Sequence, residues 1–286
     1  MIQAISASDY LQPVHDGAAL PPLEAALKNL CRERFRRIDR FIQLALLGSA
    51  RCVAGRTLQP DCGIYLGSGL GPIGNNILTQ QQLIRDAEIP KPVNFVNTLG
   101  SSAGFHVARN LGLRGQNFFI SRRGASLQAV LGAAMADLTH GVVGQALVGV
   151  VEEVTLPLGE HRLRQHLPED RTLAEGSHWF VLQPGTGDSR SLDLKRFAEF
   201  ATLEDFLKSV WRTGDRLCCA RSMETHAAKT MQRGFDAGAL SGPTSAFHDS
   251  LEAAWLAAFA VSREPGTLFL VDGHPERGWS LFYLGA

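Results

Sequence analysis

The 286-residue sequence has no excess of charge of either sign, few cysteines and no long apolar run. Lys plus Arg and Asp plus Glu each number 28, so the bulk charge does not attract the chain to nucleic acid or to an anionic membrane. No apolar stretch is long enough to cross a bilayer, and the first residues lack the basic start and apolar segment of a signal peptide. These absences predict a protein of the reducing cytoplasm that binds neither nucleic acid nor membrane.

The cysteines exclude two kinds of site. They are five in number and no two have the C-x-x-C spacing: Cys31, Cys52, Cys62, Cys218 and Cys219. An odd, irregular set predicts neither a disulfide framework nor a zinc site, and we expect no metal and no other cofactor. Cys218 and Cys219 lie within an apolar segment, where cysteine usually acts as a small hydrophobic side chain.

Apolar segments of strand length alternate with helical patterns, which is typical of an α/β protein with buried sheets. The expected strands cover residues 62–67, 117–121, 146–151, 177–184, 216–220, 267–273 and 279–286. The expected helices cover residues 38–54, 79–89, 101–111, 202–211 and 250–262, a further helix begins near Ala125, and a glycine-rich loop covers 68–76. The segment from 156 to 215 is otherwise polar and irregular.

Two blocks of the sequence look alike. A small-residue helix that begins with SLQA at 126–129 leads through glycines to the strand ALVGV, and one that begins with SLEA at 250–253 leads through Pro265 and Gly266 to LFLVD. The shared order predicts two copies of one strand-helix-strand unit, not a long repeat array.

The junction at residues 117–126 is unusual. A short apolar strand runs directly into a helix, and several enzyme folds hold an exposed nucleophile at such an elbow. Here the elbow carries Arg122 and Arg123, which cannot act as nucleophiles. A positive pair at a helix N-terminus is also mildly unfavourable unless an anion offsets it.

Five segments in order resemble the β-ketoacyl synthases of the thiolase fold, and more narrowly the non-catalytic chain-length-factor subunit of type II polyketide synthases. They are CGIYLGSGLGPI, FVNTLGSSAGFHVARNLGLRGQNFFIS, VGQALVGVVEE, DRTLAEGSHWFVLQP and RGWSLFYLGA. The resemblance implies a thiolase-like α/β fold of two pseudo-repeated halves, residues 1–155 and 156–286, in one compact unit with an abbreviated second half.

The resemblance also locates the catalytic positions. RGASLQA fits the nucleophile segment of the family with Arg123 in place of the cysteine. SGPTSAFHDSLEA fits the segment of one catalytic histidine with Pro243 in its place, and Arg221 takes the position of the other. Condensation needs a thiolate and two imidazoles, and neither arginine nor proline can replace them. We therefore expect no catalytic residues and no condensation by this chain alone.

In the family, the nucleophile strand and the preceding helix border the dimer interface. The resemblance thus implies a heterodimer with a catalytic ketosynthase, whose acyl tunnel this chain would complete, and acyl carrier protein as a transient partner. The implied substrates are fatty-acyl or polyene-like chains, with aryl polyenes and aromatic polyketides both open as products. The candidate partner and tunnel residues are Phe105, His106, Asn117, Phe118, Phe119, Ile120, Arg122 and Arg123. The two arginines either line the tunnel or are vestigial.

Three alternatives accompany this interpretation. The chain could be a stand-alone acyltransferase, hydrolase or cyclase that uses rearranged residues such as His226, His248 or Cys219. The literal G-x-G-x-x-G at 69–74 raises a dinucleotide site, but the acidic strand end expected about 20 residues on is missing. The basic run from Arg32 to Arg40 is read first as a solvated helix face and second as a docking patch for an acidic partner.

Overall fold

The computed structural model describes residues 2–185, 192–198, 212, 215–219, 251–262, 266–274 and 278–285. Its strands are β1 (Ile2–Ser8), β2 (Leu11–Val14), β3 (Gly63–Gly67), β4 (Asn117–Ile120), β5 (Ala146–Glu152), β6 (Leu173–Pro184), β7 (Leu192–Ala198), β8 (Arg216–Cys219), β9 (Thr267–His274) and β10 (Gly278–Gly285). Its α-helices are α1 (Glu24–Leu30), α2 (Arg40–Cys52), α3 (Ile73–Gln80), α4 (Pro92–Asn97), α5 (Ser101–Leu111), α6 (Ser126–Thr139), α7 (Leu158–Arg164) and α10 (Leu251–Ser262).

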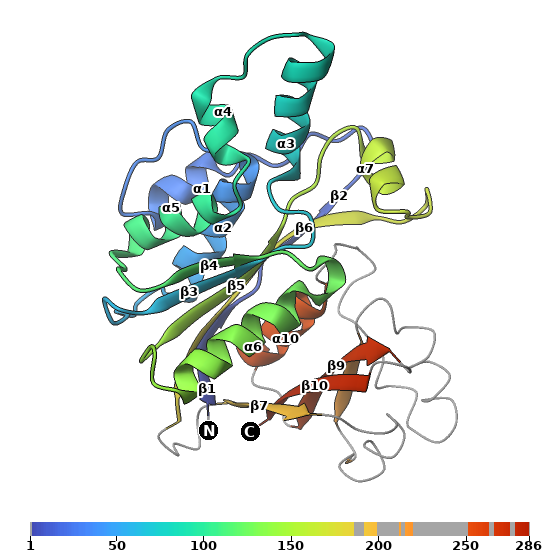
Figure 1. Ribbon diagram of the computed structural model, residues 1–286. Coiled ribbons are helices and arrows are strands. Elements are labelled where there is room, and N and C mark those ends of the chain that lie inside the picture. Colours follow the sequence, from blue (N-terminus) through green and yellow to red (C-terminus); the bar gives the residue numbers. More distant parts are fainter. Residues whose placement is uncertain are drawn as a thin grey trace.

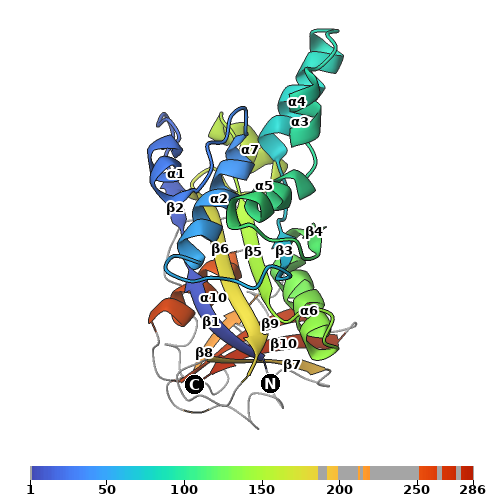
Figure 2. The same cartoon turned by 90° about the vertical axis from the view of Figure 1, so that its left-hand side faces the viewer.

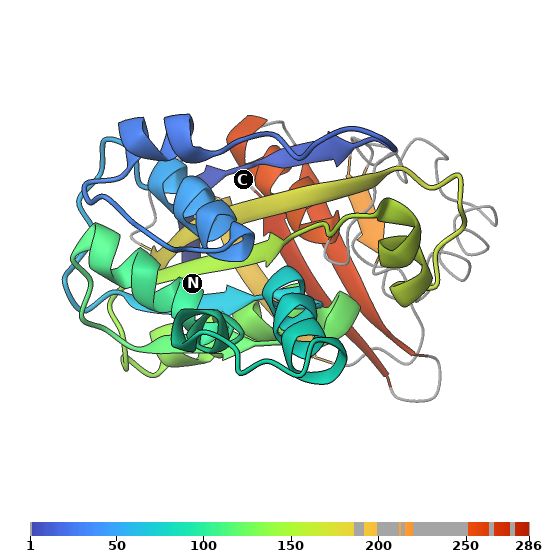
Figure 3. The same ribbon diagram turned by 90° about the horizontal axis from the view of Figure 1, so that it is seen from above.

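The strands follow the order β4-β3-β5-β6-β1-β7-β10-β9-β8, and β2 pairs with β6. Helices α2 and α5 pack on one face of the N-terminal strands, and α6 and α10 lie side by side on the other face (Figure 1). Seen from above, β9 and β10 pass beneath these strands at an angle (Figure 3). The molecule is therefore layered, with α6 and α10 between the two groups of strands (Figure 1).

Each face of the N-terminal strands has its own core, because side chains alternate along a strand. On β5, Val148 and Val150 join the cluster formed with α6 and α10, whereas Leu147 and Val151 join the cluster formed with α2 and α5. The sequence of β5 is apolar from Ala146 to Val151 and ends in Glu152, and all its residues are buried, as expected of a strand that is covered on both faces.

The strand pairing repeats in the two halves. In the first, β5 follows α6, lies parallel to β3 and pairs antiparallel with β6, which pairs antiparallel with β1. In the second, β9 follows α10, lies parallel to β8 and pairs antiparallel with β10, which pairs antiparallel with β7. β1 and β7 join the halves. The two predicted copies are thus real, while the boundary at residue 155 stays a prediction.

Most predicted elements are confirmed within a few residues, but the region after the glycine-rich loop differs. Helix α3 begins at Ile73, inside the segment expected to be a loop, and a π-helical turn, Gln81–Arg85, follows it. Six further elements were not expected from the sequence, namely strands β1, β2 and β7 and helices α1, α4 and α7. The helix predicted over 202–211 lies outside the described residues.

Helices α3 and α4 form an arm that projects from the body (Figure 2). The side-chain amide of Asn75 on α3 donates to the backbone oxygen of Asn94 on α4, which links the two helices. Several large apolar side chains on and beside the arm are exposed, among them Leu83, Ile84, Ile89 and Phe95.

Candidate functional site

Three adjacent parallel strands have their carboxyl ends side by side, and we call this row of strand ends the sheet edge. The strand order is β4-β3-β5, so Ser121, Ser68 and Glu152 lie at neighbouring carboxyl ends. Loops that follow such ends commonly carry the functional groups of α/β proteins. Here the elbow follows β4, the glycine-rich loop follows β3, and the pair Glu152–Glu153 follows β5.

The elbow is held by Ser126, the first residue of α6, which is fully buried. Its hydroxyl oxygen accepts from the backbone N–H of Arg122 at 3.0 Å. The same Oγ lies 2.9 Å from the backbone oxygen of Ser68 and 2.7 Å from that of Arg123, so its proton is shared between these two acceptors. The side chain therefore ties the elbow to the end of β3.

Arg123 occupies the turn between strand and helix with a φ of +50°. This left-handed conformation costs a residue with a Cβ about 1–3 kcal/mol, so the surrounding fold imposes it. The side chains of Arg122 and Arg123 are both exposed, as is Ser121. The backbone of a nucleophile elbow is present, but its apex carries a solvated cation.

The family of the chain follows from this region. Residues 13–166, more than half of the sequence, match the model of the β-ketoacyl synthase N-terminal domain. The chain belongs to the β-ketoacyl synthase family. A search of curated proteins finds no match.

Solved structures agree with this family. The fold is similar to the ishigamide ketosynthase/chain length factor, with a TM-score of 0.69 and 16% identity over 99% of this chain and 98% of that one. It is similar to AntDE:AntF, a type II polyketide synthase acyl-carrier protein in complex with its ketosynthase, with a TM-score of 0.69 and 13% identity over 100% and 99%. The ketosynthase ApeO in complex with its chain length factor ApeC from Xenorhabdus doucetiae gives 0.51 and 14% over 98% and 99%. At these identities the likeness concerns the fold, and the predicted thiolase-like α/β class is confirmed.

The predicted catalytic positions are only partly visible. Arg123 lies at the elbow, where the family resemblance places the nucleophile. Arg221, Pro243, His226 and His248 lie outside the described residues, and Cys219 is described only through the backbone of β8. Whether the two histidine positions approach the elbow therefore stays a prediction.

The candidate partner residues lie together around β4. Among the described strands β4 pairs only with β3, so its outer edge is open, and Asn117 and Phe118 are exposed there. Phe119 instead points inward and packs edge-on against Phe41, while Ile120 packs against the α6 core. Four residues in sequence thus divide between the surface and the two cores.

Helix α5 places two further candidates near this edge. Phe105 is 58% exposed, and the ring of His106 packs edge-on between Phe105 and Phe35. Burial, followed by the charge of Arg109, lowers the pKa of His106, so this imidazole is neutral at pH 7. Its Nδ1 is buried and has no hydrogen-bond partner.

The glycine-rich loop does not form a phosphate cradle. The N–H of Gly69 donates to Glu152 at 2.6 Å, that of Gly71 to the Ser68 hydroxyl at 2.8 Å, and that of Gly74 to Glu153 at 2.7 Å. These backbone donors are already used by the protein, and two of the acceptors are carboxyl groups that occupy the place a phosphate would need. The dinucleotide alternative has no structural support.

The basic run is not the helix face that we expected. Residues 31–39 form the connection between α1 and α2, and Arg32, Arg34, Arg36 and Arg37 are exposed on it. Arg40 is different, because its Nε donates to the fully buried Glu175 at 3.0 Å and its Nη2 forms a shorter bond to the same carboxylate. Sequence reasoning missed this pair because the two residues are 135 positions apart.

A second group of carboxyls lies on the α2 side of the sheet edge. Burial, together with the charges of Asp39 and Glu175, raises the pKa of Glu153 to about 8 despite the Gly74 N–H bond. Burial also raises the pKa of Asp39 to about 6, although this carboxylate caps α2 by accepting from the Ile42 N–H at 2.9 Å. The only sequence signal for this group was two acids in a row at the end of a buried strand.

Within the described ranges, no cluster of three or more His, Cys, Asp or Glu side chains is arranged to hold a metal ion. Over the same residues, no helix combines the length and apolarity that crossing a membrane requires.

Proposed function

We propose that the chain is a non-catalytic, chain-length-factor-like subunit that pairs with a catalytic ketosynthase and shapes its acyl tunnel in type II polyketide or fatty-acid-like biosynthesis. One observation carries this proposal: the elbow is retained in detail, down to the strained turn, while its apex residue is Arg123. A condensing enzyme needs a thiolate there to carry the acyl chain. A guanidinium group stays protonated and has no lone pair to offer.

The surface around the elbow supports a heterodimer. The open edge of β4 offers backbone N–H and C=O groups to a strand of another chain. Exposed apolar side chains on β4, α4, α5 and the α4–α5 junction accompany this edge: Phe95, Val96, Leu99, Phe105 and Phe118. The central part of a stable interface has this apolar and aromatic character. We therefore assign Asn117, Phe118, Phe105 and the neutral His106 to the partner contact, with Arg122 and Arg123 at its border.

The exposed arginines of the α1–α2 connection support a carrier protein as a second, transient partner. The connection lies against α5 and α4, because the backbone N–H of Arg32 donates to Asn110 at 2.9 Å and Asn97 donates to the backbone oxygen of Arg37 at 3.2 Å. A cluster of one charge sign beside an interface steers an oppositely charged protein toward it. The proposed partner is an acidic acyl carrier protein.

The heterodimer is tested by coexpression with candidate ketosynthases that have an intact cysteine and two histidines. We expect wild-type chain to copurify with one of them as a 1:1 complex by light scattering. Phe118→Asp should abolish the complex while the separate chain keeps its circular dichroism spectrum, because the charge lies in the contact. Leu163→Asp changes a more exposed apolar residue on α7, which lies well apart from β4 (Figure 1), and should leave the complex intact. Normal assembly of the Phe118 variant would contradict the proposed contact.

The stand-alone acyltransferase or cyclase makes a different prediction. It requires a nucleophile in this chain that an acyl-thioester can modify, for example Cys219. Burial raises the pKa of Cys52 and Cys62 to about 12, so neither thiol is a thiolate at neutral pH. We expect intact-mass spectra to show no acyl adduct after incubation with acyl carrier protein thioesters, with the partner ketosynthase as the positive control. A stoichiometric adduct on this chain alone would favour the enzyme.

A further inference from the structure

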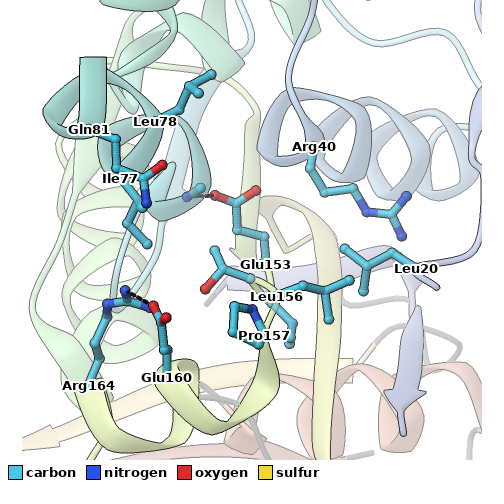
Figure 4. Close-up of a pocket in the computed structure, with 13 residues that line it drawn as sticks. Leu20, Arg40, Ile77, Leu78, Gln81, Glu153, Leu156, Pro157, Glu160 and Arg164 are labelled. Carbon is cyan, nitrogen blue, oxygen red and sulfur yellow. Dashed lines mark hydrogen bonds and ion pairs between the residues drawn. The ribbon is translucent and has the colours of Figure 1, made fainter. Parts of the chain in front are cut away.

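A cavity of about 370 Å³ lies between α3 and α7, on the α2 side of the sheet edge (Figure 4). Its walls are mostly apolar and include Leu20, Ile77 and Val154, and the exposed Leu78 and Leu156 stand at its mouth. Ligand pockets commonly have volumes of about 300–1,000 Å³, and an apolar cavity of about 150 Å³ already holds a benzene molecule. The space is therefore adequate for a small organic ligand.

One polar group points into this space from the end of β5. The Glu153 carboxyl stands in the middle of the lining side chains, and its Oε1 accepts the Gly74 N–H at 2.7 Å (Figure 4). The approach is close because Gly74 has no side chain: a Cβ there would lie 3.3 Å from Oε1. One oxygen of the carboxyl group is thus used by the protein, which leaves the other for a ligand.

The remaining charges of the lining are paired. Arg40 is bound to Glu175, and the Nη2 of Arg164 donates to Glu160 at 2.8 Å (Figure 4). A charged ligand would have to displace one of these partners or enter an apolar space uncompensated. The Glu153 carboxyl is protonated at pH 7, since its pKa is raised to about 8, and a protonated carboxyl can donate a hydrogen bond.

We propose that this cavity is a binding site for a neutral ligand with an apolar body and a carbonyl oxygen, and that the Glu153 carboxyl group recognises the carbonyl by donating a hydrogen bond to it. The apolar walls accept the body of the ligand, and the carboxyl at the end of β5 fixes its orientation. The site differs from the elbow, which lies on the α6 side of the same sheet edge.

Two sources can supply this chemistry. One is a free ketone or ester of small size. The other, which rests on the proposed function, is the keto-bearing part of a chain that the partner ketosynthase elongates. Both present the same carbonyl oxygen and apolar body, so the site itself is tested before its source.

The test compares acetophenone with α-methylstyrene, in which a CH2 group replaces the carbonyl oxygen and the branched shape is kept. Binding to the full chain is measured by ligand-observed NMR titration at pH 6.5. We expect acetophenone to bind about tenfold more tightly, as one hydrogen bond to a buried group allows. Glu153→Leu should remove this preference, whereas Glu153→Gln should keep it because the amide still donates.

The pH dependence distinguishes recognition by Glu153 from general apolar binding. Neither probe titrates, so the acetophenone preference should disappear in the wild type as pH rises past about 8 and persist in Glu153→Gln. The groups that face Glu153 are Asp39 and Arg40 from α2, Glu175 from β6, and Glu160 and Arg164 from α7. Asp39 has a pKa of about 6 and completes its titration at lower pH.

Equal binding of the two probes, no binding of either, or a preference that survives in Glu153→Leu would overturn the site. The source of the ligand is then identified from the length of the products that the heterodimer makes. An altered product length in Glu153→Leu identifies the elongated chain as the ligand, and an unchanged length identifies a free ligand. If the chain forms no heterodimer but still prefers acetophenone, the proposed function is refuted and the binding site is not.

Discussion

The charged side chains at the sheet edge are exposed on one side of the sheet and buried on the other. On the α6 side, Arg122 and Arg123 are exposed, and the strain lies in the backbone. On the α2 side, Arg40, Glu175 and Glu153 are withdrawn from water, and their chemistry is set by their partners. Since both sites follow parallel strands of one sheet that are separated only by β3, their position in the fold does not explain the difference. Burial does: an exposed charge is solvated and tolerant, whereas a buried charge must be paired or neutral.

The largest expected effect tests the buried side. Glu175→Ala leaves the Arg40 guanidinium largely buried without its carboxylate, and should lower the free energy of unfolding by about 3–5 kcal/mol. Glu160→Ala removes an exposed pair one helical turn apart and should cost less than about 0.5 kcal/mol. Urea unfolding followed by the fluorescence of the four tryptophans measures both. Similar losses in the two variants would show that burial is not the deciding factor.

The second prediction uses pH. Burial raises the pKa of Glu153 from its ordinary value of 4.5 to about 8 in the folded chain, so the folded state holds an extra proton between these two values. Stability from this group is complete below the lower value and falls as pH rises through the window. His161 contributes to stability with the opposite pH dependence. Burial lowers its pKa from 6.5 to about 4, so its contribution is complete above pH 6.5 and is lost as pH falls toward 4.

Between pH 6.5 and 8 we therefore expect the unfolding free energy of the wild type to fall by about 2 kcal/mol through Glu153. Glu153→Gln should show a flat profile over this range in the same urea experiment. A variant that keeps the slope of the wild type would place the titrating group elsewhere.

The smallest expected effect tests the exposed side. Arg123→Gly relieves the left-handed turn and should stabilise the chain by about 0.5–1 kcal/mol, because glycine adopts a positive φ at no steric cost. Arg122 has a φ of −137°, so Arg122→Gly should instead destabilise by a similar amount through backbone entropy. Thermal melts of the two variants check the sign. A loss in both would mean that the Arg123 side chain contributes contacts that outweigh the strain.

Sequence reasoning succeeded where the signal was local. The predicted helix over 101–111 coincides with α5, because Gly112 ends it in the left-handed conformation expected of a helix terminus. The elbow was predicted from a strand followed by small helix-forming residues, and Ser126 begins α6 as expected. The family was predicted from ordered motifs, and Arg123 at the apex was visible in the sequence.

The same reasoning failed where contacts between residues far apart in the sequence determine the local structure. Helix α3 begins in a glycine-rich segment because Glu153, 79 positions away, accepts the Gly74 N–H in its first turn. Arg40 was interpreted as part of a solvated face because no pattern near it in the sequence indicates its ion pair with Glu175. Helix α7 was missed because its short sequence, LGEHRLR, has no long amphipathic period.

The sequence by itself determined the α/β class, the repeated strand-helix-strand unit, the family and the arginine pair at the elbow, since each depends on patterns that span a few turns or strands. Only the tertiary structure decided that Arg123 is solvated, that β4 presents an open edge, and that Glu153 is a neutral group in a cavity. The physical reason is that solvation and pKa depend on what surrounds a side chain, and here the surroundings come from strands and helices far apart in the sequence.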